Sequence, residues 1–427
     1  MEYFEIKGGD VVKGEVVPSG NKNEALPVIA AALLSNGKVR ISNVPDILDV
    51  RVMIQIAEDM GSKVTRISKN EVEMDSSVIF DKPLDSELCK MVRTSILFAG
   101  SLIARKGSVI LPPPGGDVIG RRRLDTHFIG LEQLGAKCSF HNEGYVIKAD
   151  GLTGADVFLD EASVTATENI IMAAVMAKGT STIRNAATEP HVQGLCHFLN
   201  KMGAKISGIG TNILMIEGVS SLGGCDHRIG PDYIEAGSFI ALAAMTGGEL
   251  LIKEAGDCDM RSVLNTFKKI GISTEKRGSD LFVPAHDELV VVKELNNAIP
   301  KIDDGPWPSF PSDLMSIAIV ASTKARGTVL FFEKMFESRL FFTDRLVGMG
   351  AQIILCDPHR VVVSGPSDLH GSKLDSPDIR AGMAVLMAAI CAKGTSRIYN
   401  IRQIDRGYEA IEHKLRQIGV TIDRNKD

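Results

Sequence analysis

The chain has little of what marks several large classes of protein. Its 427 residues include one tryptophan, and the seven cysteines are scattered without a CxxC pair. Such cysteines are typical of reduced thiols and argue against a disulfide framework or a zinc site. The net charge of −5 provides no basic field for nucleic acid. The longest apolar runs, Ala25–Leu34 and Gly382–Ala392, are too short to cross a bilayer.

The rest of the composition is that of a globular protein. Hydrophobic residues make up 44% and charged residues 24% of the chain, both ordinary values. The length predicts two or three domains. The first residues, MEYFEIKGGD, include acidic side chains and no long apolar stretch, so we expect no secretory signal. These features together predict a cytoplasmic protein with no membrane or nucleic-acid partner.

An internal repeat organises the chain. A run of small residues, a glycine and a short apolar or β-branched stretch recurs roughly every 70 residues, as in AVMAKGTSTI and ASTKARGTVL. The glycines of this first phrase are Gly37, Gly107, Gly179, Gly248, Gly327 and Gly394. A second phrase, as in MGAKISG, follows each one, with glycines Gly61, Gly135, Gly203, Gly271, Gly350 and Gly419.

Each repeat predicts two helices and at least two strands. The small-residue run predicts a helix that ends near the first glycine, where a positive φ is readily adopted. The stretch HVQGLCHFLNKMGA has apolar residues at helical spacing and ends at the second glycine. Helices made of Ala, Leu, Ile, Val and Met are apolar nearly all round, so they should be buried with the sheets outside. The pattern therefore predicts an α/β fold, with a solenoid of identical repeats as the alternative.

Polar segments that interrupt the repeats are candidates for function. The first is Pro18–Glu24, which leads directly into an apolar helix. Lys22 and Asn23 would then lie at the helix N-terminus, a place that suits an anionic ligand. The alternative is N-capping by Ser19, Asn21 or Asn23, with Lys22 solvated.

The second segment runs from Leu111 to His127 and contains three prolines, two glycines and three consecutive arginines. Asp117 lies at the tip of this loop, and Arg121–Arg123 follow it. One carboxyl group beside three guanidinium groups suits a phosphate or carboxylate ligand with a proton donor at hand. The alternative is a solvated basic turn.

The third segment, Asp303–Asp313, carries the only tryptophan of the chain, Trp307. Asp313 precedes an apolar helix, so it is either a base held by a proline-rich loop or simply the cap of that helix.

The fourth segment, Asp405–Glu409, is predicted to open the last helix. Its Arg406, with Arg339 and Arg380, lies near a repeat boundary, and we expect the three arginines to converge on one anion. Neither a phosphate-binding loop nor metal-ligand spacing occurs in the sequence, so we expect no cofactor and no metal.

These segments carry a resemblance to a known family. The motifs SGNKNEALP, PPPGGDVIGRR, SVTATENIIMAA, GPWPSFPSD, FESR, DIRA and IDRGYE occur in this order. Over essentially its whole length the chain resembles the enolpyruvyl transferases, and is most similar to the branch that acts on UDP-N-acetylglucosamine. The shikimate branch differs in the N-terminal and glycine-rich motifs.

The resemblance implies a two-domain inside-out α/β barrel of six repeated units with buried central helices. One domain would comprise residues 22–230, and the other residues 1–21 with 231–427. Substrates would bind in the cleft between them.

The resemblance also implies a reaction. The enolpyruvyl group of phosphoenolpyruvate would pass to the sugar 3′-hydroxyl by addition and elimination, with release of phosphate, in the first committed step of peptidoglycan synthesis. The catalytic residues would be Asp117, Asp313, Lys22 and Arg406. Phosphoenolpyruvate would be bound by Lys22, Arg122, Arg339, Arg380 and Arg406. The UDP-sugar would be bound by Asn23, Arg93, Arg122, Arg123, Leu124, Asp125, Ser163, Val164, Thr165, Asp313 and Met335.

Asp117 departs from the family pattern, because many members have a cysteine at the tip of this loop. An aspartic acid can also deliver a proton to the methylene carbon of phosphoenolpyruvate. It cannot form the stable thioether that the epoxide antibiotic fosfomycin requires, so the sequence predicts insensitivity to that compound.

Other departures concern the acceptor. Asn21, Glu24, Arg123 and the stretch Asp303–Trp307 differ from the usual family residues, which leaves a modified sugar-nucleotide or a shikimate-type acceptor as the alternative. A non-catalytic, sugar-nucleotide-binding regulator is a further alternative. The presence of Lys22, Asp117, Asp313 and Arg406 argues against it, since a binding module needs no carboxyl group at the loop tip.

Overall fold

The computed structural model describes residues 2–116, 119–120, 122–141, 144–257 and 259–426. The chain forms two compact units. Unit 1 comprises Met1–Ser19, Val118–Arg121 and Pro231–Asp427, and unit 2 comprises Gly20–Asp117 and Arg122–Gly230. Each unit contains a hydrophobic core of its own.

Three apolar helices form the centre of unit 2: α1 (Lys22–Ala32), α4 (Phe98–Lys106) and α6 (Val164–Ala174). Every residue of α6 from Ala166 to Ala174 is buried, including the polar Thr167, Glu168 and Asn169. The second helix of each repeat is α2 (Leu48–Asp59), α5 (Asp125–Gln133) or α7 (Pro190–Lys201). The short α3 (Ser86–Met91) precedes the 3₁₀ helix η1 (Arg93–Leu97).

Three sheets belong to unit 2, in the strand orders β13-β3-β5-β4, β6-β8-β7 and β11-β12-β10-β9. In the first and third, the short strands β13 and β9 pair parallel to β3 and β10, and the other neighbours are antiparallel. The strands are β3 (Lys38–Ser42), β4 (Lys63–Ser68), β5 (Glu71–Asp75), β6 (Ser108–Leu111), β7 (Lys137–His141), β8 (Gly144–Lys148), β9 (Asp156–Phe158), β10 (Thr180–Arg184), β11 (Lys205–Ser207), β12 (Ile213–Glu217) and β13 (Asp226–Arg228).

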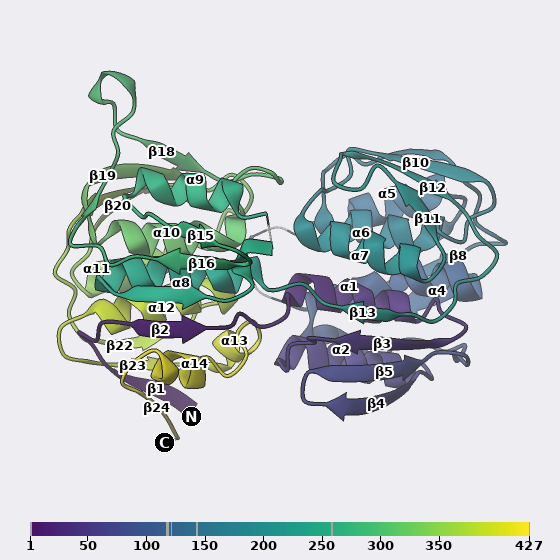
Figure 1. Cartoon of the computed structure of the whole chain (residues 1–427). Helices are drawn as coiled ribbons and strands as arrows, with labels where there is room; N and C mark the ends of the chain where they lie inside the picture. Colours follow the sequence, from purple (N-terminus) through teal and green to yellow (C-terminus); the bar gives the residue numbers. More distant parts are fainter. Residues whose placement is uncertain (1, 117–118, 121, 142–143, 258, 427) are drawn as a thin grey trace. The chain divides into compact units, whose positions relative to one another are not determined.

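Unit 1 repeats this plan around the central helices α8 (Tyr233–Thr246), α10 (Met315–Ser322) and α12 (Ile379–Cys391) (Figure 1). The second helices are α9 (Arg261–Lys269), α11 (Thr343–Gly348) and α14 (Ile411–Gln417), and α13 (Arg402–Asp405) is an additional single turn. Its 3₁₀ helices are η2 (Ala255–Asp257), η3 (Leu295–Asn297), η4 (Ser312–Leu314) and η5 (Arg339–Phe342).

The sheets of unit 1 have the orders β15-β16-β14-β2, β17-β19-β21-β20 with β18 on β19, and β22-β23-β1-β24. The strands are β1 (Glu2–Lys7), β2 (Lys13–Val16), β14 (Glu249–Ile252), β15 (Glu275–Arg277), β16 (Asp280–Val283), β17 (Leu289–Val290), β18 (Lys301–Asp303), β19 (Ala325–Phe332), β20 (Gln352–Asp357), β21 (Arg360–Gly365), β22 (Lys373–Asp375), β23 (Thr395–Tyr399) and β24 (Ile422–Lys426). The predicted fold, with buried helices inside and sheets outside, is confirmed, and the solenoid alternative is wrong.

The two sets of glycines behave differently. All glycines of the second phrase have positive φ and directly follow the C-cap residue of the second helix, as predicted. Of the first set, only Gly107 caps a helix, with φ of 70°. Helix α8 ends at Gly247, one residue before the predicted Gly248. Gly327 lies within β19. Helix α10 ends at Ser322 and is followed by a turn, so this glycine comes after the helix end and not at it.

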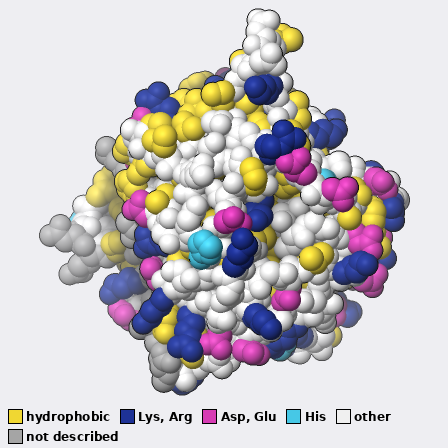
Figure 2. Space-filling model, turned by 90° about the vertical axis from the view of Figure 1, so that its left-hand side faces the viewer, with side chains coloured by type: hydrophobic (Ala, Val, Ile, Leu, Met, Phe, Trp, Pro, Cys, Tyr) yellow, Lys and Arg dark blue, Asp and Glu magenta, His cyan; other side chains and the backbone are white. Residues whose placement is uncertain are grey.

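The surface carries charges of both signs. On the face drawn in Figure 2, Lys and Arg side chains alternate with Asp and Glu side chains and do not form one broad patch. Within the described ranges, no helix has both the length and the apolar character needed to cross a membrane.

Candidate active site

The N-terminus of α1 holds a buried ion pair. Asn21 caps the helix, because its Oδ1 accepts hydrogen bonds from the backbone N–H groups of Asn23 (2.9 Å) and Glu24 (3.3 Å). Lys22 Nζ lies 2.8 Å from Asp49 Oδ2, and the two side chains are only 8% and 6% exposed. The capping alternative is therefore right for Asn21 and wrong in leaving Lys22 solvated. Asp49, in the first turn of α2, was not predicted, since an acidic residue there is ordinary.

Glu24 faces the interior of unit 2. Its Oε1 lies 2.9 Å from His227 Nε2, and its Oε2 accepts a hydrogen bond from the Gly230 N–H at 3.1 Å. A Cβ atom on Gly194 of α7 would lie 2.5 Å from the Glu24 carboxyl carbon. Glu24, which departs from the family pattern, thus connects α1, α7 and the end of β13.

Arg93 and Arg122 form a second cationic group in unit 2. Arg93 opens η1, and its Nη2 donates to the Arg122 carbonyl oxygen. Burial, and then the nearby Arg122, lower the pKa of Arg93 to about 10. Arg123 is half-exposed and pairs with Asp125 at 3.0 Å, so the solvated-turn alternative fits this arginine. Asp117 and Arg121 lie outside the described residues.

The predicted sugar-nucleotide segments lie at the starts of α5 and α6. Leu124 is the N-cap residue of α5 and Asp125 its first residue. Ser163 caps α6 by accepting a hydrogen bond from the Ala166 N–H at 3.4 Å, and Val164 and Thr165 follow.

His127 was missed by the sequence reasoning and contacts this segment. Asn169 Nδ2 donates to His127 Nδ1 (2.8 Å), and Asn169 Oδ1 accepts from the Gly100 N–H, which settles the amide orientation. The proton of His127 is therefore on Nε2, which donates to Thr165 Oγ1 at 3.1 Å. Burial, and then Arg93, lower the pKa of His127 to about 3. A neutral, buried histidine therefore holds Thr165 in place. In the sequence, a single histidine on a helix face gives no sign of such a contact and is interpreted as a core residue.

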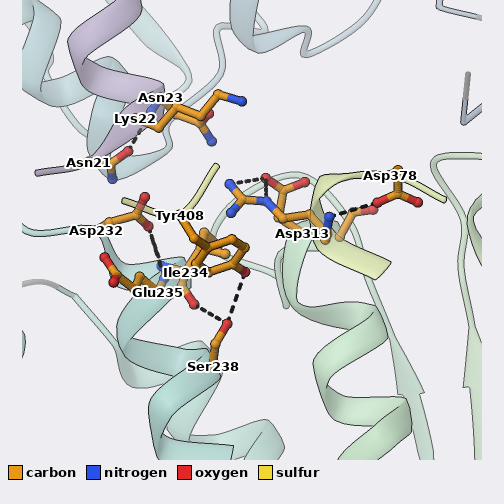
Figure 3. A network of polar contacts seen from close by, with 12 residues as sticks. Asn21, Lys22, Asn23, Asp232, Ile234, Glu235, Ser238, Asp313, Asp378 and Tyr408 are labelled. Atoms are coloured by element: carbon orange, nitrogen blue, oxygen red, sulfur yellow. Dashed lines mark hydrogen bonds and ion pairs between the residues drawn. The ribbon is translucent and has the colours of Figure 1, made fainter. Parts of the chain in front are cut away.

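In unit 1, two buried arginines hold the carboxylate of Asp313, a residue that Figure 3 labels near Tyr408 and Asp378. Arg339 Nη1 and Nη2 both donate to Oδ1 at 3.2 Å, and Arg380 Nε donates to Oδ2 at 3.1 Å. The arginine side chains are 6% and 7% exposed, but that of Asp313 is 30% exposed. Asp313 lies in η4 and caps no helix. The capping alternative is therefore wrong.

Arg380 is held in place from several sides. Asp378 caps α12 by accepting the backbone N–H groups of Arg380 (2.8 Å) and Ala381 (2.9 Å). The guanidinium lies 5.5 Å from the ring centroid of Tyr408, whose hydroxyl contacts Ser238 at 3.2 Å. Burial opposes the charge, but Asp313 raises the pKa of Arg380 well above its usual range. Its Nη1 has no hydrogen-bond acceptor among the described residues and can donate to an incoming anion.

The segment around Arg406 differs from the sequence prediction in its secondary structure. Helix α13 ends before it and α14 begins at Ile411, so the prediction that Asp405–Glu409 opens the last helix is wrong. The physical reason is packing: Tyr408 is buried, and a Cβ on Gly407 would lie 2.2 Å from Ile379. Arg406 Nη1 donates to Gln403 Oε1 at 2.9 Å.

Met335 follows β19 and presents a partly exposed side chain, and its N–H donates to Glu333 Oε1 at 3.1 Å. Trp307 is packed against the core of unit 1 and lies 5.9 Å from the ring of Tyr233. In the part of the chain that the structure describes, no group of three or more His, Cys, Asp or Glu side chains could hold a metal ion.

Comparisons with known proteins agree with this arrangement. The family model for EPSP synthase (3-phosphoshikimate 1-carboxyvinyltransferase) matches residues 6–415. Two relatives named UDP-N-acetylglucosamine 1-carboxyvinyltransferase come from Treponema denticola (55% identical, 99% of both chains) and Bradyrhizobium diazoefficiens (52%, 99% of this chain and 98% of the relative).

Two solved structures share the fold. The enolpyruvyl transferase NikO from Streptomyces tendae has a TM-score of 0.88 at 22% identity, covering 100% of this chain and 99% of that one. EPSP synthase from Acinetobacter baumannii has a TM-score of 0.77 at 18% identity, covering 100% of both. The chain therefore belongs to the EPSP synthase family, among relatives that carry the name UDP-N-acetylglucosamine 1-carboxyvinyltransferase.

Proposed function

We propose that this chain transfers the enolpyruvyl group of phosphoenolpyruvate to the 3′-hydroxyl of UDP-N-acetylglucosamine and releases phosphate. The reaction would be the first committed step of peptidoglycan synthesis and would take place in the cytoplasm. Full-length relatives at 55% and 52% identity support this acceptor. The observation that carries the proposal is the partly exposed Asp313 carboxylate between Arg339 and Arg380.

Charge is the main requirement of this chemistry. Both substrates are polyanions, and fixed cations in a site of low dielectric stabilise charge as it develops on phosphate and carboxylate. In the proposal, Lys22, Arg122 and Arg406 bind phosphoenolpyruvate, and Arg339 and Arg380 complete the positive site. Lys22 and Arg380 are already oriented, by Asp49 and Asp313 respectively.

The acceptor would be bound by groups from several elements. Arg93 and Arg122 would pair with the diphosphate, and Asn23 would contact the sugar. The start of α6, held by His127, would bind the nucleotide through Ser163–Thr165. Arg123, Leu124, Asp125 and Met335 would line the same site.

The first half of the proposed mechanism is an addition. Asp313 accepts the proton of the 3′-hydroxyl as the hydroxyl oxygen attacks C2 of phosphoenolpyruvate. Asp117 delivers a proton to the methylene carbon, which becomes a methyl group. An incoming anion takes up N–H groups of Arg339 and Arg380 that now bond to Asp313, and this makes the carboxylate more basic.

The second half is an elimination. The Asp117 carboxylate left by the addition takes a proton from the methyl group of the tetrahedral adduct, the C–O bond to phosphate breaks, and the double bond re-forms. The proton that Asp313 took from the hydroxyl passes to the leaving phosphate. Phosphate leaves as an anion, which the same arginines stabilise.

The experiment is an assay of phosphate release with phosphoenolpyruvate and UDP-N-acetylglucosamine, with shikimate 3-phosphate as the control acceptor. We expect release only with the nucleotide sugar. Asp313→Asn should lower kcat by about 10²–10⁴-fold, and the matched control Asp344→Asn, on the exposed side of α11, should not. Release with shikimate 3-phosphate alone, or with neither acceptor, would overturn the proposal.

A further inference from the structure

Two buried carboxyl groups in unit 1 have no part in the mechanism above. Asp304 directly follows β18 and Glu333 directly follows β19, and these strands are parallel, with Asp303 opposite Phe332. The carboxyl ends of both strands thus meet at one edge of the sheet. Glu333 is 0% and Asp304 2% exposed.

The hydrogen bonds of Glu333 reach the turn that carries Met335 and the residue before Asp313. Glu333 Oε1 accepts the N–H groups of Met335 and Phe336, each at 3.1 Å. The Ser312 hydroxyl lies 3.1 Å from both carboxyl oxygens of Glu333. Glu333 therefore connects two parts of the proposed acceptor site.

The hydrogen bonds of Asp304 are incomplete. Its Oδ1 accepts the Lys334 N–H at 2.6 Å, but its Oδ2 has no donor among the described residues. A buried oxygen without a donor is costly, and two adjacent buried carboxylates cannot both be ionised without strong repulsion. One proton between the two groups removes both penalties. Consistent with this, burial, and then Asp304, raise the pKa of Glu333 to about 8.

Few other charges face this pair. Arg339 Nε lies 3.9 Å from Glu333 Oε2, but the same guanidinium is bonded to Asp313. His359 Nδ1 contacts the backbone oxygen of Glu333 at 2.7 Å, and the Lys334 ammonium pairs with Asp303. Arg339 is thus the cation for which Glu333 and Asp313 compete.

We propose that Asp304 and Glu333 share one proton and act as positioning residues for the acceptor. With one proton, the pair holds Ser312, Met335 and Phe336 in place and leaves Arg339 to Asp313. The inference rests on the proposed function for its effect on catalysis, but the shared proton does not depend on it.

The consequence is a specific dependence on pH. When the shared proton is lost, the two carboxylates repel each other and draw Arg339 away from Asp313, so the acceptor site loosens. If only the protonated form binds the acceptor, the KM for UDP-N-acetylglucosamine rises about tenfold between pH 7 and pH 9. The kcat at saturating acceptor changes much less, because bound acceptor holds the site in its competent form.

Asp304→Asn provides the sharpest test. The amide nitrogen of the asparagine can donate to Glu333 at every pH, and its oxygen can still accept the Lys334 N–H. We expect the rise in KM between pH 7 and pH 9 to shrink to less than about twofold. Glu288→Gln, which removes an exposed carboxylate paired with Arg326, should keep the rise of the unmodified protein. Glu333→Ala should raise KM at all pH values, without a step near pH 8.

Infrared difference spectra recorded against pH test the proton independently of activity. The unmodified protein should show the C=O stretching band of a buried carboxylic acid that disappears near pH 8, and both Asp304→Asn and Glu333→Gln should lack it. Absence of this band, or an unchanged rise in KM in Asp304→Asn, would overturn the inference. If UDP-N-acetylglucosamine supports no turnover while the band titrates as expected, the proposed function fails and the shared proton stands.

Discussion

Replacing Asp49 by asparagine tests the idea that a buried ion pair holds Lys22 ready for an anion. Lys22 Nζ and Asp49 Oδ2 are 2.8 Å apart, and both side chains are more than nine-tenths buried. Asparagine has nearly the same shape and keeps an acceptor oxygen, so the substitution removes the negative charge and little else. It leaves the ammonium group buried beside a neutral partner.

The expected effect on stability follows from this geometry. At 2.8 Å and an effective dielectric constant of 20, the attraction between the charges is about 6 kcal/mol. Desolvation of the two ions offsets much of this, so a net coupling of about 1–3 kcal/mol should remain. Removing one partner costs more, about 3–5 kcal/mol, because the other charge stays buried and uncompensated.

Urea unfolding of Lys22→Met, Asp49→Asn and the double variant measures these quantities as a double-mutant cycle. The double variant should be less destabilised than the sum of the single ones. The matched control is the same cycle on the exposed pair Lys38 and Glu73, which should show no measurable coupling. If Asp49→Asn lowered the free energy of unfolding by less than about 1 kcal/mol, the pair would not be the buried contact described here.

Three further predictions test other parts of the structure. The folded pKa of His127 is about 3, below the unfolded value of about 6.5. Its contribution to stability is therefore complete above pH 6.5 and is lost as pH falls toward 3, by about 1.4 kcal/mol per pH unit. Urea unfolding at pH 7 and pH 5 should show this slope in the unmodified protein and not in His127→Phe, and equal slopes would contradict it. Gly194→Ala should lower the free energy of unfolding by about 1–3 kcal/mol, since the added Cβ meets Glu24. Adding Glu24→Ala to this variant should restore part of the lost stability. No recovery would show that another contact is responsible. Fosfomycin should leave the unmodified enzyme active and inactivate Asp117→Cys with time, and a drug adduct on Asp117 would refute that reasoning.

The repeated architecture could be predicted because it is written in local patterns. The alternation of small-residue helices and strands recurs along the chain, and a glycine after each second helix adopts the positive φ that other residues disfavour. Of the first set of glycines, only Gly107 is itself a helix C-cap, and the others lie beyond the helix end predicted near them. Gly37 and Gly394 stand instead just before strands β3 and β23, a difference of a few residues that local pattern does not resolve.

Part of the candidate site could be predicted as well. Lys22 and Asp313 stand in polar, proline- or glycine-containing segments that interrupt an apolar repeat, so their positions are conspicuous in the sequence. What each residue does was not visible there. Local rules allowed Asp313 to be a helix cap, and only the approach of Arg339 and Arg380, 26 and 67 residues away, decided otherwise.

The sequence by itself determined the six-fold repetition, the burial of the apolar helices and the places where polar segments emerge, because periodicity and backbone preference act between near neighbours. Tertiary structure alone decided which charges are buried together. Asp49 beside Lys22, His127 between Asn169 and Thr165, and Asp304 beside Glu333 are ordinary residues in their own segments. Their contacts come from partners that only folding brings close together, in surroundings where water no longer screens the charges.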